Sequence, residues 1–416
     1  MQISSSKEIM TNRVVQKDCM SIKILHNAPG VGKGSMGIGQ VALNLAKAQH
    51  ELGCHTKIWC YGDDADLKWA EESAGIDRSQ ISLFSSVSVL NFTYSKAMFD
   101  AAESNAEGFN VVHQHGVWTG CSLISNTLRK RHRIPTVIAP HGSLQKYALE
   151  RSLWKKKIAL LAYESDNLRK ASCLHATSEA EIDDFRNFGL NNPIALIGNG
   201  VSSKSINDSG VAERFLEQFN IPKDRRILLF LSRITPKKNL PITLQAISRI
   251  RDKLSNWLFV IAGTDEFNHQ REVETLVKAL NLGVMIRLVG PLYDQNKSDA
   301  FAASDAFILP SYSEGAPMVV LDSLAAGVPV ITTKATPWEA LVNYKCGWWV
   351  EPSIDGFIDA LQSVSAASSL QLKEMGIRGK ALVRAQYLWS SQAQKTLDLY
   401  AWILGKGAKP DFIVCD

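Results

Sequence analysis

The chain has 416 residues, of which 45% are hydrophobic and 21% charged, and its formal net charge at pH 7 is +5. This length predicts two domains of roughly 200 residues each and is enough to bury a sizeable core. The mild net charge argues against a dedicated nucleic-acid binder.

The cysteines and the apolar runs bear on where the protein works. The seven cysteines are scattered and include no CxxC pair, which argues against a disulfide framework or a zinc knuckle and fits a reducing compartment. The first twenty residues lack the apolar core of a secretory signal, and no apolar run approaches the ~18–20 residues that span a bilayer. We therefore expect a cytoplasmic protein that is soluble or peripheral at the inner face of the membrane.

Short apolar runs alternate with longer amphipathic stretches along the chain, which is typical of parallel α/β sheets. In the first half the pattern predicts a helix at 39–52 and strands at 22–26, 57–61, 111–113, 136–139, 172–176 and 194–197. A stretch rich in Ser, Asn, Asp and Gly at 202–210 is the best candidate for a linker. After it, the pattern predicts helices at 240–253 and 270–279 and strands at 227–231, 258–262, 286–289, 306–309 and 328–332. The segment 390–404 is predicted to be a helix with no strand after it, which leaves two doubly wound Rossmann-like domains.

The first candidate binding loop, 29–39, holds five glycines. Glycine lets backbone amides come close to a phosphate or a sugar, and the following helix adds the positive end of its dipole. The spacing Gly32-x-Gly34-x-x-Gly37 satisfies the dinucleotide pattern, but the loop is too long and no acid ends the second strand at the usual distance. A P-loop is excluded because Gly34 follows Lys33 where Ser or Thr is required. A flexible loop without a ligand is the alternative.

Three histidines, His113, His115 and His141, are predicted to follow strands, and two of them precede a glycine. Ligands of open parallel sheets bind beyond the carboxyl ends of the strands, so these histidines indicate a shared cleft. Purely structural histidines are the alternative. A metal site at His113 and His115 also stays open, although no nearby acid or cysteine completes it.

In the second half, charged residues follow two predicted strands. Arg233 and, five residues later, Lys238 suit a diphosphate, and solvated surface charges are the alternative. Glu314 follows the strand at 306–309, and Asp322 lies eight residues further on, on a predicted helix whose first amides suit phosphate oxygens. Eight residues are about two helical turns, so both acids could face one elongated ligand. In the alternative, Glu314 only caps the helix.

Together these segments resemble the retaining glycosyltransferases of family four, whose GT-B fold has two Rossmann-like domains facing across a cleft. The resemblance extends from Ile22 to Leu404. The segments that carry it occur in the family's order: SMGIGQVALNLAKAQHELG, APHG, HATSEAE, GNGV, SRITPKKN and PSYSEGAPMVVLDSLAAGVPVI. The last contains the family's pair of acids separated by seven residues.

The resemblance implies a role for each matching residue. Glu314 is expected to hold the hydroxyl groups of the donor sugar, while Arg233 and Lys238 neutralise the departing diphosphate. His141 is expected to lie over the sugar from the first domain. Gly37 brings backbone up to the phosphates, and His115 more loosely lines the acceptor side. Contacts to the donor are also implied for the backbone of Gly315, Ala316, Pro317, Met318 and Val319.

Two positions depart from the family's pattern. Asp322 stands where the family has a glutamate that holds the nucleotide ribose, and it is one methylene shorter, so the contact needs a water or a small shift of the helix. Asn239 replaces the glycine that commonly follows the lysine.

The implied domains are residues 22–201, completed by a crossover helix at 388–410, and residues 202–387, which bind the nucleotide sugar. The expected reaction moves a sugar from a UDP- or GDP-sugar to a saccharide or lipid-linked saccharide in cell-surface polysaccharide biosynthesis. Cations and helix amides stabilise the leaving diphosphate, so no metal cofactor is expected. No carboxylate nucleophile of the glycosidase kind is found, which favours attack by the acceptor hydroxyl on the face that the diphosphate leaves.

Two basic runs, 129–133 and 151–157, suit an anionic membrane surface or a lipid-diphosphate acceptor, since Trp154 lies in the second. A solvated charged face is the alternative. Other functions of the same fold, a sugar-nucleotide isomerase or a phosphorylase, stay open. A non-catalytic partner protein that binds sugar nucleotides also stays open as a function, and Asp322 is the feature that favours it. A nicotinamide dehydrogenase is disfavoured, because the acid that such an enzyme carries at the end of the second strand is misplaced here.

Overall fold

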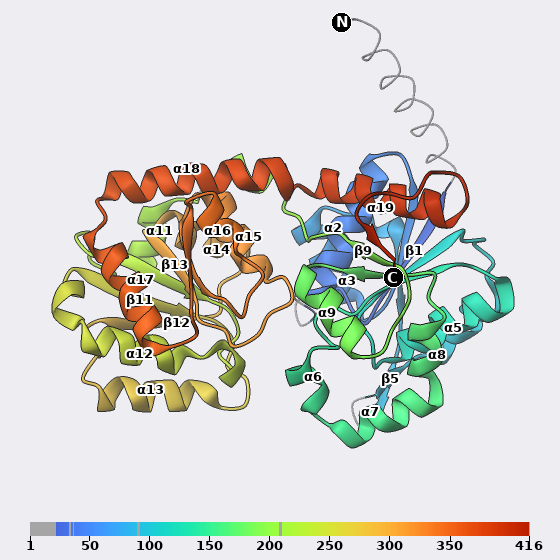
Figure 1. Ribbon diagram of the computed structural model, residues 1–416, viewed down its shortest axis with the longest axis horizontal. Helices are drawn as coiled ribbons and strands as arrows, with labels where there is room; N and C mark the ends of the chain where they lie inside the picture. The colour runs from blue at the N-terminus through green and yellow to red at the C-terminus, as the bar shows by residue number, and fades with distance from the viewer. Residues whose placement is uncertain (1–21, 33–34, 36, 90–91, 208–209, 416) are drawn as a thin grey trace, which may run out of the picture. The chain divides into compact units, whose positions relative to one another are not determined.

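The computed structural model describes residues 22–32, 35, 37–89, 92–207 and 210–415. The polar first twenty residues, Lys33 and Gly34 lie outside the described residues, and so do the expectations that depend on them. The described chain forms two compact units (Figure 1). Unit 1 comprises the residues up to Gly200 together with those from Trp389 onward, and unit 2 comprises Val201–Leu388.

Unit 1 is built on an eight-stranded sheet with the strand order β16-β9-β8-β7-β6-β1-β2-β3. All neighbouring strands in it are parallel except β16, which runs antiparallel to β9. The strands are β1 (Lys23–Ala28), β2 (His55–Tyr61), β3 (Ile81–Phe84), β6 (Val111–His115), β7 (Thr136–Ala139), β8 (Cys173–Ala176), β9 (Ile194–Leu196) and β16 (Ile413–Val414). A separate hairpin pairs β4 (Val87–Val89) with β5 (Phe92–Tyr94).

The helices of unit 1 bury the apolar faces of this sheet, as parallel sheets require. They are α2 (Ile38–Glu51), α3 (Asp64–Ala74), α4 (Lys96–Ser104), α5 (Gly120–His132), α6 (Lys146–Glu150), α7 (Leu153–Ala159), α8 (Ser165–Arg169), α9 (Glu179–Asn187) and α19 (Trp389–Ile403). Short turns of other helix types cover Arg78–Gln80 and Leu160–Glu164. Helix α19 packs on α2, where Gln49 Nε2 donates a hydrogen bond to Thr396 Oγ1 at 2.7 Å.

Unit 2 has a six-stranded, wholly parallel sheet with the order β12-β11-β10-β13-β14-β15. Its strands are β10 (Arg226–Leu231), β11 (Trp257–Ala262), β12 (Ile286–Gly290), β13 (Ala306–Leu309), β14 (Val330–Thr333) and β15 (Gly347–Val350). Its helices are α10 (Ser203–Asn207), α11 (Ala212–Gln218), α12 (Leu240–Arg249), α13 (His269–Ala279), α14 (Asp294–Ala302), α15 (Met318–Ala326), α16 (Ala340–Asn343), α17 (Ile354–Ala366) and α18 (Ser369–Gln386). Two 3-10 turns cover Pro236–Lys238 and Arg251–Leu254.

The predicted parallel α/β architecture is confirmed in both units, and two expectations about its elements are wrong. Strand β6 runs to His115, so Gln114 and His115 belong to a central strand and not to the loop after it. The C-terminal helix is followed by a short strand, β16, which adds to the edge of the sheet. In the described part of the chain, no helix is both long and apolar enough to cross a membrane.

The packing of α18 against α15 in unit 2 depends on a close approach of two backbones. A methyl group on Gly376 would lie 1.9 Å from the carbonyl oxygen of Gly327, which ends α15. We predict that Gly376→Ala lowers the free energy of unfolding by about 1–3 kcal/mol. This overpacking outweighs the roughly 1 kcal/mol by which alanine is the better helix former. Urea unfolding measures the change.

The matched control is Gly283→Ala, because no atom lies within 4 Å of the added methyl group there. Its effect should stay within about 1 kcal/mol. Equal stability of Gly376→Ala and the wild type would contradict the close approach.

Candidate functional site

The order of strands in each sheet brings two distant loops together. In unit 2 the chain order reverses between β10 and β13, which are hydrogen-bonded neighbours with Leu228 opposite Ala306. The loops that leave these two strands therefore begin side by side at the carboxyl edge, the usual ligand site of an open parallel sheet. Their contact is direct, because the amide of Tyr312 donates to the carbonyl of Lys237 at 3.0 Å.

A buried ion pair joins the two loops. The Nζ atom of Lys238 lies 2.6 Å from Oε1 of Glu314, and the two side chains are 8% and 10% exposed. Lys237 contributes a second, more distant charge at 4.0 Å from the other carboxylate oxygen. Burial by itself would raise the pKa of Glu314, but the two lysines outweigh it and hold that pKa below its ordinary value. The carboxylate is thus ionised at neutral pH.

The turn that carries Lys238 explains the residue that follows it. Pro236–Lys238 forms a 3-10 turn, and Asn239 then adopts a left-handed conformation with φ 52° before α12 begins. Asparagine tolerates this conformation better than most residues that have a side chain. Asn239 therefore adopts the backbone conformation for which the family commonly has a glycine.

The other two charged residues of the predicted donor site lie on the same unit, each with its own partner. Arg233 pairs with Glu266 at 2.7 Å, and its side chain is largely exposed. Asp322, on α15, accepts a hydrogen bond from Lys297 at 2.6 Å. The ion pair with Lys297 orients the shorter acid, a contact that the sequence did not predict.

The residues between the two acids lead into a helix without a side-chain cap. The cap position of α15 is Pro317, so Glu314 does not cap the helix but precedes it. The predicted spacing of two helical turns between the acids is therefore wrong, because only Asp322 is helical. The first amides of α15, which include those of Met318 and Val319, remain at the end of the helix where its dipole is positive.

In unit 1 the corresponding reversal lies between β1 and β6. The glycine-rich loop leaves β1 and ends at Gly37, whose φ of 105° and ψ of −93° form the start of α2. A side chain is strained in this backbone conformation, so the position requires glycine. Beyond β6 the chain turns at Gly116, next to the loop that carries His141.

His141 is fixed from two sides. Its Nε2 lies 3.1 Å from Nδ1 of His115, and the two rings are nearly parallel at 8°. Its backbone is left-handed, with φ 52°, and the next residue, Gly142, donates its amide hydrogen to Glu181. Glu181 is buried and also accepts from the amide of Thr177 at 2.8 Å, so it ties this loop to the end of β8.

Glu181 was not selected from the sequence as a site residue, although it belongs to the HATSEAE segment. The feature of the sequence that could have identified Glu181 is its position close to the end of an apolar strand. Burial raises the pKa of the Glu181 carboxyl group. Its hydrogen bonds with Thr177 and Gly142 lower that pKa, but burial is the larger effect.

His115 and His141 belong to a larger buried cluster that the sequence did not predict as a unit. Contacts between their rings connect five histidines: His26, His113, His115, His141 and His175. Burial lowers the pKa of all five, to about 4 for His26 and His175 and to about 3 for His141. All five rings are therefore neutral at physiological pH.

Three of these histidines, His26, His113 and His115, have ring nitrogens within 4.8 Å of one another, a spacing that a metal ion could use. Hydrogen bonds already engage both nitrogens of each of the three rings. A metal ion would have to replace several of these bonds, so the hydrogen-bonded cluster is the simpler account of this geometry.

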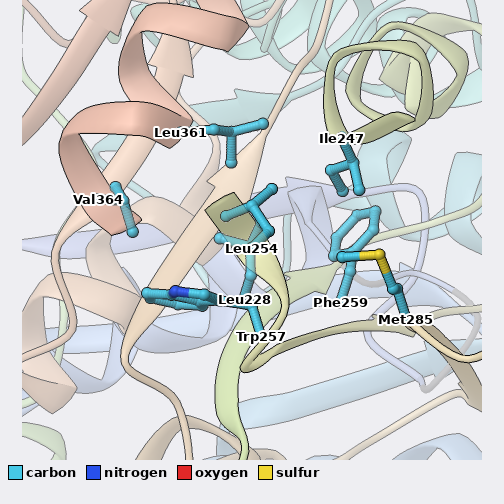
Figure 2. Close-up of a pocket in the computed structure, with 8 residues that line it drawn as sticks. All are labelled: Leu228, Ile247, Leu254, Trp257, Phe259, Met285, Leu361 and Val364. Carbon is cyan, nitrogen blue, oxygen red and sulfur yellow. The ribbon is translucent and has the colours of Figure 1, made fainter. Parts of the chain in front are cut away.

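The pocket drawn in Figure 2 lies elsewhere in unit 2 and is apolar. Its lining side chains are those of Leu228, Ile247, Leu254, Trp257, Phe259, Met285, Leu361 and Val364. Trp257 opens β11 and Met285 immediately precedes β12, so the pocket lies at the amino edge of the sheet. It offers no charged group to a phosphate and is a packing gap away from the carboxyl edge.

Two family models match this chain. "Glycosyl transferases group 1" matches residues 211–380, and "Glycosyl transferase 4-like domain" matches residues 36–200. Together they account for most of both units.

Characterised relatives are similar over much of their length. The D-inositol 3-phosphate glycosyltransferase of Streptomyces bingchenggensis is 26% identical over 306 residues, which are 70% of this chain and 66% of the relative. The UDP-Gal:alpha-D-GlcNAc-diphosphoundecaprenol alpha-1,3-galactosyltransferase of Escherichia coli is 26% identical over 301 residues, 66% of this chain and 71% of the relative. The GDP-mannose:cellobiosyl-diphosphopolyprenol alpha-mannosyltransferase of Komagataeibacter xylinus is 22% identical over 397 residues, 93% of this chain and 94% of the relative.

Solved structures share the fold. Sucrose-phosphate synthase from Thermosynechococcus elongatus superposes with a TM-score of 0.74 at 19% identity and covers 92% of this chain and 99% of its own. The Anabaena protein HepE, in complex with UDP and glucose, superposes with a TM-score of 0.73 at 16% identity and covers 91% of this chain and 99% of its own.

The buried pair in unit 2 generates a prediction about stability and pH. We expect Lys238→Met to lower the free energy of unfolding by about 3 kcal/mol at pH 7, because it removes the nearer of the two lysines that compensate the buried Glu314 carboxylate. In the wild type the depressed pKa of Glu314 contributes stability that is present above the ordinary pKa and is lost as the pH falls through the folded value. In the variant the pKa of Glu314 is higher than in the wild type, because less positive charge opposes the effect of burial, so protonation relieves the defect as the pH falls and the loss is smaller in mild acid. Urea unfolding at neutral and mildly acidic pH measures both effects.

Lys334→Met is the matched control, because Lys334 pairs with Glu351 at 2.7 Å but both side chains are exposed. It should cost less than about 1 kcal/mol at either pH. Equal losses in the two variants would contradict the importance of burial.

Proposed function

This chain belongs to the retaining glycosyltransferases of group 1, family four, which have the GT-B fold and use nucleotide-sugar donors, and we propose that it moves a hexose from a UDP- or GDP-sugar to a lipid-linked saccharide. The observation that carries the proposal is the buried pair of Glu314 and Lys238 at the carboxyl edge of the unit 2 sheet. It places an ionised acceptor of hydroxyl hydrogen bonds next to a cation.

The proposed roles follow from the charges. The Glu314 carboxylate accepts hydrogen bonds from sugar hydroxyl groups, and charge makes such bonds stronger than neutral ones. Lys238, Arg233 and the first amides of α15 stabilise the negative charge that develops on the leaving diphosphate. Asp322, held by Lys297, binds the ribose, and the backbone of Gly315–Val319 follows the sugar and phosphates. On unit 1, Gly37 is proposed to bring its backbone to the phosphates, His141 to contact the sugar and His115 to line the acceptor side.

The proposed reaction exchanges one bond at the anomeric carbon for another on the same face of the sugar. The bond from the anomeric carbon to the diphosphate oxygen breaks, and the acceptor oxygen forms the new bond. The proton of the acceptor hydroxyl passes to a phosphate oxygen of the leaving group. No carboxylate of the enzyme becomes glycosylated, in contrast to retaining glycosidases, so mass spectrometry of the enzyme during turnover should find no glycosylated carboxylate.

A lipid-linked acceptor is supported by the names of two relatives and by one surface of unit 1. The relatives from Escherichia coli and Komagataeibacter xylinus are named for acceptors on diphosphoundecaprenol and diphosphopolyprenol. Helix α7 and the turn after it expose four large apolar side chains: Leu153, Trp154, Ile158 and Leu161, the last of them 91% exposed. Arg151 and Lys157 beside them are also exposed. An apolar face with adjacent cations suits the boundary of an anionic membrane.

The other basic run does not contribute to this surface as the sequence predicted. The Arg129 guanidinium is mostly buried and donates to Thr136 and to backbone carbonyl groups. Lys130 pairs with Asp166 at 2.7 Å, and Arg131 pairs with Glu103 at 2.6 Å. Because Arg129 is mostly buried and acids pair with Lys130 and Arg131, we place the candidate membrane surface at residues 151–161.

Donor binding tests the proposed function. UDP-, GDP-, ADP- and dTDP-sugars are screened for thermal stabilisation of the protein, and we expect one UDP- or GDP-sugar to stabilise it. At 100 times its dissociation constant a ligand adds about 2.7 kcal/mol, which gives a clear shift in Tm. Arg233→Ala should abolish most of the shift. Arg249→Ala, which removes another exposed, paired arginine of unit 2, should leave it unchanged.

Glu314→Gln separates an enzyme from a non-catalytic partner. It keeps the shape of the side chain and removes the charge, so turnover should fall by about 10²–10³ while the donor still binds. Donor binding without turnover in the wild type, across lipid-linked acceptors, would favour the partner. No binding of any donor would overturn the proposal.

Vesicle sedimentation tests the acceptor surface. Anionic vesicles at low salt should pull the protein down, and Trp154→Ser with Leu161→Ser should release most of it because the apolar contacts are lost. The control pair Lys130→Ala and Arg131→Ala removes the same number of side chains, both of which are paired with acids, and should have little effect. Loss of sedimentation in the control alone would show that the basic run binds the membrane instead.

A further inference from the structure

The buried histidines of unit 1 form two hydrogen-bonded chains that meet at Gln49. In the first, His26 Nε2 lies 2.8 Å from Gln49 Oε1, and His26 Nδ1 lies 3.0 Å from His115 Nε2. His115 Nδ1 in turn lies 3.1 Å from His141 Nε2. His26, Gln49 and His115 are fully buried, whereas His141 is partly exposed.

The orientation of the Gln49 amide is fixed by its other partner. Thr396 gives its hydroxyl hydrogen to the carbonyl of Ala393 at 2.7 Å, so its oxygen accepts from Gln49 Nε2. The opposite orientation would cost the hydrogen bond from Thr396 to Ala393 and would leave Gln49 Oε1 3.3 Å from the Tyr400 oxygen, whose hydrogen is given to His113. Gln49 Oε1 therefore faces His26 and requires a proton on His26 Nε2.

This requirement passes along the chain, because a neutral imidazole carries one proton. With its proton on Nε2, His26 has an unprotonated Nδ1 that must accept from His115 Nε2. His115 then has an unprotonated Nδ1 that must accept from His141 Nε2. His141 is left with an unprotonated Nδ1, to which no described residue hydrogen-bonds.

The second chain obeys the same logic and closes on the same glutamine. His175 Nε2 donates to the carbonyl of Ile197 at 2.7 Å, so its Nδ1 accepts from His113 Nε2 at 3.1 Å. His113 Nδ1 then accepts from the hydroxyl of Tyr400 at 2.7 Å, and that hydroxyl accepts from Gln49 Nε2 at 3.3 Å. With all five rings protonated on Nε2, every donor in both chains meets an acceptor.

We propose that Gln49, His26 and His115 are positioning residues that fix the tautomer of His141, so that its Nδ1 accepts a hydrogen bond from a hydroxyl group of a bound saccharide. The bearing on catalysis rests on the proposed function, whereas the tautomer itself does not. Burial keeps the rings neutral, which the relay needs, because a protonated ring would donate at both nitrogens and reverse part of the chain. Unlike a simple packing role, a relay makes a buried side chain decide whether His141 accepts or donates.

Nitrogen NMR of the protein labelled with ¹⁵N-histidine tests the tautomer directly. Imidazole nitrogens with and without a proton have well-separated shifts, and single substitutions assign the nine histidines. In the wild type at neutral pH we expect Nε2 to be protonated and Nδ1 unprotonated in all five buried rings. A proton on Nδ1 of His141 would overturn the proposal, and this result comes from the spectrum of the wild-type protein.

A matched pair of variants tests the relay. His26→Leu and His26→Asn introduce side chains of nearly equal shape, but only asparagine offers His115 an oxygen acceptor. In His26→Leu the buried His115 Nε2–H loses its partner, so His115 should move its proton to Nδ1 and force His141 to do the same. We expect kcat/KM to fall about tenfold with this variant. His26→Asn should restore the wild-type tautomer and most of the activity, although both variants lose packing.

The outcomes separate the relay from the proposed function. An unchanged His141 tautomer in a folded His26→Leu protein would overturn the relay. A changed tautomer with unchanged kcat/KM would overturn the role of His141 as the acceptor. If no donor and acceptor give turnover, the proposed function fails, yet the NMR spectra still decide the relay.

Discussion

A buried polar group must have a partner, and both sheets of this protein carry polar side chains to places that water does not reach. At the carboxyl edge of the unit 2 sheet the requirement pairs Glu314 with Lys238. In unit 1 it joins five histidines, a tyrosine and a glutamine into two chains with a defined direction. Unpartnered, each such group would cost about 1–3 kcal/mol or more, so the partners fix the geometry of both candidate sites.

The sequence predicts the architecture well because parallel strands are buried on both faces and appear as short apolar runs. It fails where a strand is not apolar. Strand β6 was predicted to end at His113, because the polar residues that follow are typical of a loop, yet they lie in the middle of the sheet. The partners of His113 and His115, among them His26, His175 and Tyr400, come from distant segments, and a single sequence does not show which residues meet.

The sequence predicts the residues of the candidate donor site more fully than the residues that hold them in place. Arg233 and Lys238 are predicted because cations after a strand suit a diphosphate, and Glu314 and Asp322 because they match the family's pair of acids. The residues that hold them, Glu266 and Lys297, lie in or beside helices where charged side chains are ordinary. The run 129–133 shows the reverse error: its charges stand out in the sequence, but Lys130 and Arg131 are paired with acids from other helices.

Helix α19 has a consequence for how the chain is made. Unit 2 is continuous in sequence, so all of its strands are available as soon as residue 388 has been synthesised. Unit 1 is not continuous in sequence. The hydrogen bond of Gln49 requires Thr396, 347 residues later, and that of His113 requires Tyr400, 287 residues later. Domains usually mature in the order in which the ribosome delivers them. Here the order is inverted, because the first unit to begin is the last that can be completed.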